Sequence, residues 1–193
     1  GVIVAGGASN EIRSNHIGTG LAGFGVLPNL DNGITLYGGA NATIIDSNVI
    51  SGNGNFAGNG WGIDIQQSGA LAPVSNTVIT RNTIGLDAAG NRIDRGAAGG
   101  EYVDPRPGLV SLGPVNRGNA GGGIRVFMGS GTAIGLPGAG NTISGNTKSG
   151  VQISGPVGVP VVLRDNRIGT DPTGTMERGN RRGVEVFAGS FAI

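Results

Sequence analysis

One short phrase constrains the fold of this chain more than any other feature: a Gly followed by an apolar residue, any residue and a second apolar residue. Its six copies are Gly1-Val2-Ile3-Val4, Gly33-Ile34-Thr35-Leu36, Gly62-Ile63-Asp64-Ile65, Gly123-Ile124-Arg125-Val126, Gly150-Val151-Gln152-Ile153 and Gly183-Val184-Glu185-Val186. Apolar side chains in each copy recur at a period of two, which is typical of a β-strand with one buried face. The phrase therefore predicts six short strands.

A second phrase lies between these strands and carries an apolar residue, an Asn three positions later and an Ile two positions after that. Its clear copies are Ile12-Asn15-Ile17, Ile45-Asn48-Ile50, Ile79-Asn82-Ile84 and Leu163-Asn166-Ile168, while Asn141-Ile143 keeps the second half. Asn favours turns and bends, so each copy predicts two further strands that meet at a bend.

The first phrase returns at intervals of 32, 29, 61, 27 and 33 residues. A unit of this length with two or three short strands cannot bury its apolar side chains alone, but stacked copies bury them continuously. Helical solenoids are excluded because the apolar spacing is two, and because the 41 Gly residues would break helices. The spacing predicts a solenoid of strands.

The interval of 61 residues is about twice the others, so it holds either a degenerate coil or an insertion. The repeat dissolves over residues 88–119, where the stretch 96–108 contains two prolines and no usable periodicity. Such a segment is typical of a loop that projects from the side of a solenoid. We therefore predict an inserted loop over residues 88–119.

Residues 48–53 and 141–146 both follow the pattern Asn-x-Ile-Ser-Gly-Asn, and residues 166–174 read Asn-x-Ile-Gly-Thr-Asp-x-x-Gly. With the Gly-Val-x-Val strands, these motifs resemble the right-handed parallel β-helix repeat proteins of the pectin-lyase-like superfamily along nearly the whole chain. The resemblance implies an all-β fold, a right-handed parallel β-helix of about six coils with a long lateral loop. It also implies an extracellular or cell-surface location.

The resemblance says less about function, because similar backbones serve pectate lyases, polygalacturonases, alginate epimerases, phage tailspikes and adhesins. We expect residues 1–193 to be one β-helix domain cut from a longer chain. Neither Gly1–Ala5 nor Gly183–Ala188 adjoins a capping helix, so we expect continuation in both directions or head-to-tail self-association.

Stacking predicts what the repeated residues do. The apolar residues of the first phrase should form two buried columns, one containing Ile63 and Ile124 and the other Ile65 and Val126. The Asn residues of the second phrase should lie at bends with a left-handed backbone and bond to one another between coils. The Gly residues before the strands are expected to be tight-turn positions with positive φ.

Residues that alternate with the core columns should face solvent, and they give the candidate site. One row contains Asp64, Arg125, Gln152 and Glu185, and the next contains Tyr37, Gln66 and Phe127. Carboxylate, guanidinium, amide and aromatic groups suit a sugar chain, so these seven residues are predicted to bind a glycan. A solvated sheet with an ordinary Asp64–Arg125 ion pair explains the same mixture.

Composition excludes several partners. The net charge of +1 and the 4% aromatic content argue against nucleic acid, and no apolar run is long enough for membrane insertion. There is no Cys. Asp87 and Asp171 each begin an Asp-x-x-Gly stretch without the alternating carboxylates of a calcium loop, so β-turns are predicted there. No metal or other cofactor is predicted.

Catalytic residues cannot be named from the sequence. Asp64 and Glu185 would lie three coils apart, roughly 14 Å, whereas glycosidases place two carboxyl groups roughly 5 to 9.5 Å apart. His16, the single His, is expected to be exposed rather than a general base. The favoured interpretation is a non-catalytic secreted or cell-surface scaffold, such as a stalk, fibre segment or adhesin, that binds polysaccharide on its outer sheet. The alternative is a polysaccharide lyase, C5-epimerase or glycoside hydrolase.

Overall fold

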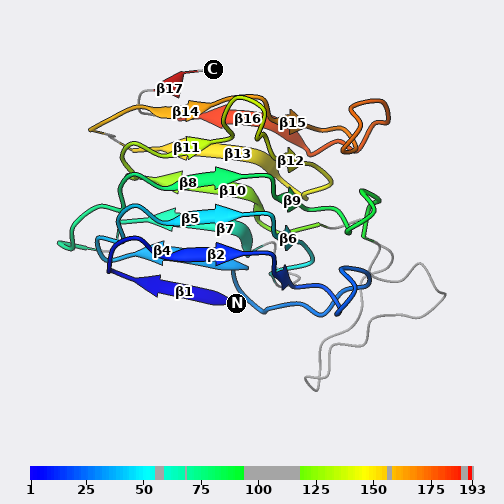
Figure 1. Cartoon of the computed structure of the whole chain (residues 1–193), viewed down its shortest axis with the longest axis horizontal. Coiled ribbons are helices and arrows are strands. Elements are labelled where there is room, and N and C mark those ends of the chain that lie inside the picture. Colours follow the sequence, from blue (N-terminus) through cyan, green and yellow to red (C-terminus); the bar gives the residue numbers. More distant parts are fainter. Residues whose placement is uncertain (55–58, 68, 94–117, 156–157, 188–190, 193) are drawn as a thin grey trace.

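The chain folds into a right-handed parallel β-helix, which confirms the predicted fold class. A computed structural model describes residues 1–54, 59–67, 69–93, 118–155, 158–187 and 191–192. Within these residues there is no helix, and every named strand pairs in parallel with its neighbours in one of three sheets. Figure 1 shows the coils stacked in the order in which the chain visits them.

Each coil contributes one strand to each sheet in turn. Sheet 1 has the order β1 (Val2–Ala5), β4 (Ile34–Tyr37), β7 (Trp61–Gln66), β10 (Gly122–Phe127), β13 (Ser149–Ser154) and β16 (Arg182–Val186). Sheet 2 has the order β2 (Glu11–Arg13), β5 (Ile44–Asp46), β8 (Val78–Thr80), β11 (Ala133–Ile134), β14 (Val161–Leu163) and β17 (Phe191–Ala192). Sheet 3 has the order β3 (His16–Ile17), β6 (Val49–Ile50), β9 (Thr83–Ile84), β12 (Thr142–Ile143) and β15 (Arg167–Ile168).

The long interval between Ile63 and Ile124 is a single coil. Strand β10 pairs directly with β7, with Ile124 beside Ile63 and Arg125 beside Asp64. The extra length of this coil therefore lies between its strands rather than in a coil of its own. Most of the loop predicted over residues 88–119, namely residues 94–117, lies outside the described residues.

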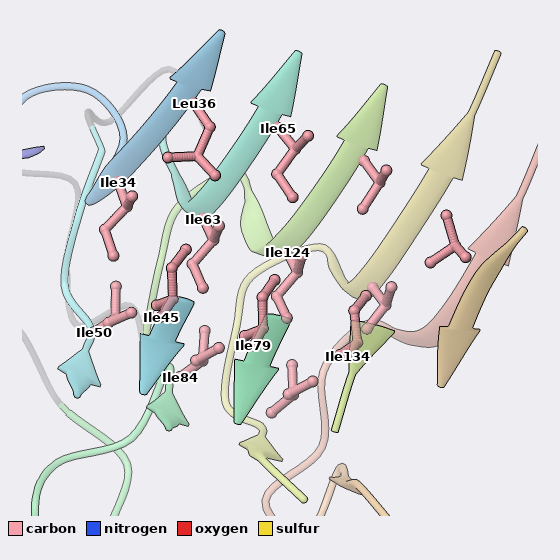
Figure 2. Close-up of a cluster of buried hydrophobic side chains, with 14 of the residues drawn as sticks. Ile34, Leu36, Ile45, Ile50, Ile63, Ile65, Ile79, Ile84, Ile124 and Ile134 are labelled. Atoms are coloured by element: carbon pink, nitrogen blue, oxygen red, sulfur yellow. The ribbon is translucent and has the colours of Figure 1, made fainter. Parts of the chain in front are cut away.

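The interior is a continuous apolar stack, as predicted. Ile34, Ile63, Ile124 and Val151 form one column of sheet 1, and all four are fully buried. Figure 2 shows the side chains of Ile34, Ile63 and Ile124 pointing from sheet 1 toward those of the other two sheets, such as Ile79 and Ile84. In the coils of β1 and β16 the corresponding Val residues pack against this cluster but are partly buried. The strict period of two is thus produced by one packed core.

The predicted Asn ladder exists, and its buried members are bonded on both sides. Asn48 Nδ2 donates to Asn82 Oδ1 at 2.9 Å, and Asn82 Nδ2 donates to Asn141 Oδ1 at 3.0 Å. The predicted left-handed backbone at these Asn residues was wrong. The positive φ belongs to the preceding residue, for example Ser47 at 58° and Arg81 at 53°. The bend before the Asn aims its amide along the stack, where the ladder bonds compensate the strain.

A second Asn ladder, which was not predicted, lies between sheet 3 and sheet 1. Asn53 Nδ2 donates to Asn119 Oδ1, and Asn119 Nδ2 donates to Asn146 Oδ1, both at 2.9 Å. Asn53 and Asn119 are fully buried. Their amide groups also bond to backbone carbonyls of the coil below, such as Ile50 O at 3.0 Å from Asn119 Nδ2. The Asn at the end of each of these coils is therefore hydrogen-bonded to both the preceding and the following coil.

The Gly residues that begin the repeated phrase, within or just before the strands of sheet 1, pack against this second ladder. A Cβ added at Gly62 would lie 2.8 Å from Asn119 Nδ2 and 2.8 Å from Ile84 Cγ2. The same arrangement recurs at Gly33 and Gly150, and none of these three has a positive φ. The predicted turn role was therefore wrong: Gly is required here because the backbone passes too close to the neighbouring coil for any side chain.

Three coils carry a hairpin at the same edge of the solenoid, next to the ends of β3, β9 and β15 (Figure 1). The hairpins contact one another although a coil without this hairpin separates each pair, since Ala88 N donates to Gly23 O at 3.2 Å and Arg178 Nε to Gly90 O at 3.4 Å. In the last hairpin Gly174 N donates to Asp171 O at 3.0 Å, which is the predicted Asp-initiated β-turn.

Candidate functional site

Five outward-facing residues of sheet 1 form one row across the strands. Thr35 pairs with Asp64, Asp64 with Arg125, Arg125 with Gln152, and Gln152 with Glu185. The four predicted candidates in this row are thus neighbours in consecutive coils, about 4.8 Å apart per step. The row brings opposite charges and amides together along the stacking direction.

A surface pocket of about 470 Å³ opens on this row near the N-terminal ends of the strands. That volume lies within the range of small-ligand sites. Among the residues that line it are Asp31, Asn32, Trp61, Arg125, Lys148 and Gln152. We call this the Arg125 pocket. Two of the seven predicted residues, Arg125 and Gln152, line it.

Asp64 lies beneath the pocket rather than in contact with solvent. Arg125 Nε lies 2.6 Å from Asp64 Oδ1 and Arg125 Nη2 lies 2.6 Å from Asp64 Oδ2, a bidentate pair. The Asp64 side chain is 1% exposed and that of Arg125 is 34% exposed. The prediction that Asp64 faces solvent was wrong, because the guanidinium group of the next coil covers its carboxylate.

Asn32 and Trp61 complete a bonded cluster with this ion pair. Asn32 Nδ2 donates to Asp64 Oδ2 at 3.0 Å, while Asn32 Oδ1 accepts the Trp61 backbone N–H at 2.7 Å. The Arg125 guanidinium lies 5.8 Å from the centre of the Trp61 ring, within cation–π range. We call Asn32, Trp61, Asp64 and Arg125 the floor cluster. Its mutual bonds fix the base of the pocket in one arrangement.

Trp61 could not have been assigned to the outer face by simple alternation. Counting from Ile63, the period of two places Gly62 outside and Trp61 inside. The structure shows the reverse, since a Cβ at Gly62 would meet the interior and Trp61 lines the Arg125 pocket. A Cβ at Gly122, in the next coil, would lie 2.4 Å from the Trp61 ring, so the ring lies against a residue without a side chain.

Glu185 makes its contacts away from the pocket. Its carboxylate accepts a hydrogen bond from Ser149 Oγ and lies 3.0 Å from Arg182 Nη1. Its side chain is 17% exposed, and both oxygens have partners. Glu185 therefore belongs to the row by register but not to the lining of the Arg125 pocket.

The other predicted residues form the second row, two positions further along the strands. Gln66 pairs with Phe127, and Phe127 pairs with Ser154. Phe127 is 39% exposed, whereas Tyr37 and Gln66 are half-buried. None of the three lines the Arg125 pocket. This second row stays a candidate contact surface for a chain longer than the pocket itself.

The described residues contain no cluster of three or more His, Cys, Asp or Glu side chains that could hold a metal ion. Asp64 uses both carboxylate oxygens on Arg125, and it is separated from Glu185 by two intervening strands, β10 and β13. His16 is exposed on sheet 3, where its Nδ1 lies 2.7 Å from Leu21 O. Asp31, at the pocket rim, is an exposed carboxylate.

Comparison of the chain with protein-family models, with curated proteins and with solved structures gives no match. Across the described part of the chain, no helical segment has the length and hydropathy needed to cross a membrane. The parallel β-helix is therefore established by the register of its own strands.

Proposed function

We propose that this chain is a non-catalytic β-helix scaffold of the pectin-lyase-like kind, secreted or displayed at a cell surface, that binds polysaccharide in the Arg125 pocket. The supporting observation is the pocket itself: a depression with amide, carboxylate and ammonium groups at its rim, above a floor cluster that is already bonded. Sugar hydroxyls need donors and acceptors that are held in place, and a pre-ordered floor lowers the entropic cost of binding.

A parallel β-helix suits this role because its coils stack at a fixed spacing. Binding groups in successive coils lie about 4.8 Å apart, so a chain lying across sheet 1 meets a new side chain at each coil. Gln152 and Arg125 supply two such steps at the pocket, and Phe127 offers an exposed ring beside them. The Asn ladders, one of which lies between sheet 3 and sheet 1, hold neighbouring coils at this spacing.

Polysaccharide cleavage or epimerisation is the second candidate, and one observation favours it. Lys148 lines the same pocket as Arg125 and Asp31, so an amine, a guanidinium and an exposed carboxylate share one site. Lyases and epimerases need a base beside a charge-neutralising group. Binding without turnover is favoured because the fork of Arg125 is already engaged by Asp64.

The test is a screen of the chain against immobilised neutral and uronate polysaccharides, measuring both retention and the release of unsaturated or reducing ends. We expect retention without new ends, and loss of retention in Gln152→Ala but not in Arg164→Gln, an exposed residue outside the pocket. Product formation that disappears in Lys148→Gln would establish the enzyme instead. Absence of retention on every polysaccharide would remove glycan binding from consideration.

A further inference from the structure

We infer that the Arg125 pocket takes a neutral, hydroxyl-bearing glycan rather than an acidic one; this rests on the proposed glycan-binding function. The first observation is the balance of charge. Two carboxylates, Asp31 and Asp64, and two cations, Arg125 and Lys148, lie in or directly beneath the pocket, so the formal charges of these described residues cancel.

The second observation concerns the guanidinium group. A carboxylate or sulfate is bound best by an arginine that offers two parallel N–H groups. Arg125 already gives Nε and Nη2 to Asp64, at 2.6 Å each, and its charge is matched by a side chain that is 1% exposed. An acidic sugar would have to displace a buried partner to use that fork, leaving the Asp64 carboxylate without a counter-charge. Arg125 therefore serves to build the floor.

The third observation is the position of the remaining charges. Lys148 and Asp31 are both exposed and line the same pocket with opposite signs. A polyanion attracted by the ammonium group would be repelled by the carboxylate. Because both side chains are exposed to solvent, the attraction and the repulsion are weak and screened by salt. Neither residue supplies the one-sided field that selects a charged polymer.

The groups that are left suit hydroxyls. Gln152 is half-buried on the row beside Arg125 and lines the pocket. Its side-chain amide carries both donors and an acceptor, which matches the dual character of a sugar hydroxyl. A site that recognises hydroxyls through amides discriminates by hydrogen bonding, and its affinity responds little to ionic strength.

The experiment compares oligosaccharides of glucan, mannan, galactan and xylan with oligogalacturonate and oligoalginate, each titrated at low and at high salt by calorimetry. We expect at least one neutral oligosaccharide to bind, with a dissociation constant that changes less than about twofold with salt. Gln152→Ala should weaken that binding about fivefold or more through loss of hydrogen bonds. Lys148→Gln should change it less than about twofold. Phe127→Ala, on the strand of Arg125 but outside the pocket, reports any contribution from the second row.

A gain-of-function variant sharpens the test. Asp31→Asn leaves the floor cluster intact and gives the pocket a net positive charge, so it should acquire salt-sensitive binding of oligogalacturonate. Preferential binding of a uronate by the parent, reduced by salt and by Lys148→Gln, would overturn this inference while leaving the proposed function standing. If no oligosaccharide binds the parent, the proposed function itself fails.

Discussion

The inside and the outside of sheet 1 follow opposite rules. On the inner face, Ile34, Ile63, Ile124 and Val151 place nearly the same side chain in every coil, and all are fully buried. On the outer face, the row that contains Asp64 changes its residue at each step. Because coils lie about 4.8 Å apart, each interior residue packs against the equivalent residue of the next coil, and the residues of one column must have similar size and polarity. The outer face is under no such constraint and is free to carry function.

One outer residue breaks this division. Asp64 belongs to the outer row, yet it is as well buried as the core because Arg125 and Asn32 close over it. The candidate site therefore lies where a buried, hydrogen-bonded cluster forms on the outer side of sheet 1. Substitutions on the inner face should reduce the stability of the fold most and those on the outer face least. Substitutions in the floor cluster should have an intermediate effect on stability.

The largest effect is expected for Ile63→Asp. The substitution places a carboxylate in a column where each side chain is covered by its neighbours above and below, and the cost of burying it exceeds the stability of an ordinary domain. We expect no cooperative unfolding transition by circular dichroism. Ser154→Asp, in the outer row of the same sheet, should melt like the parent. Equal melting of Ile63→Asp and the parent would mean that the two faces are assigned the wrong way round.

Arg125→Met should destabilise the chain by about 3 kcal/mol, because it leaves the buried Asp64 carboxylate without its bidentate partner. Arg164→Met removes an exposed Arg that directly follows strand β14 and serves as the control, with little expected change. Denaturant unfolding of both variants measures the difference. Adding Asp64→Asn to Arg125→Met should recover part of the loss. A control-like result for Arg125→Met would show that the floor cluster behaves as ordinary surface.

The interior could be predicted from the sequence because stacking repeats its signal. Ile63 and Asn82 each recur at a fixed offset in several coils, and a repeated residue type with one spacing has few structural explanations. The second ladder was not predicted because its members do not all share one offset. Asn53 and Asn146 each follow an Ile by three residues, whereas Asn119 follows Ile84 by 35, with a hairpin and residues 94–117 between them.

The pocket could be predicted only in part. Arg125 and Gln152 follow from alternation, but Trp61 does not, because strict alternation at Gly62 would place Trp61 on the inner face. Asn32 and Lys148 lie just before their strands, where the period of two has not yet begun. The outer face lacks repetition, so no column of like residues marks its functional positions. Sites on a solenoid are therefore harder to find from sequence than its core.

Gly62→Ala tests whether close packing, rather than backbone conformation, requires the Gly that begins the repeated phrase of sheet 1. The new methyl group would lie 2.7 Å from Gly123 O and 2.8 Å from Asn119 Nδ2, so coils must separate locally. Overpacking of this kind should cost about 2 kcal/mol. Gly179→Ala, where the nearest atom would be Glu177 Oε1 at 3.7 Å, should be nearly neutral. Thermal melts of the two variants give the comparison, and equal losses would contradict the steric explanation.

The smallest effect concerns a hairpin outside the stack. The hydroxyl of Thr173 and the backbone N–H groups of Met176 and Thr175 donate to the Asp171 carboxylate and lower its pKa to about 2. Since the pKa in the folded hairpin lies below the ordinary value, the stabilisation is complete above about pH 4 and is lost as the pH falls through about 2. We expect amide exchange at Met176 to accelerate over that range, while the melting temperature of the coils does not respond to this group. Thr173→Val removes the largest cause and should move the carboxyl titration, followed by NMR, toward its ordinary midpoint. An unshifted midpoint for Asp171 in the parent would show that this carboxylate does not stabilise the hairpin. The contact of Arg178 with Gly90 of the neighbouring hairpin would then be the interaction to test next.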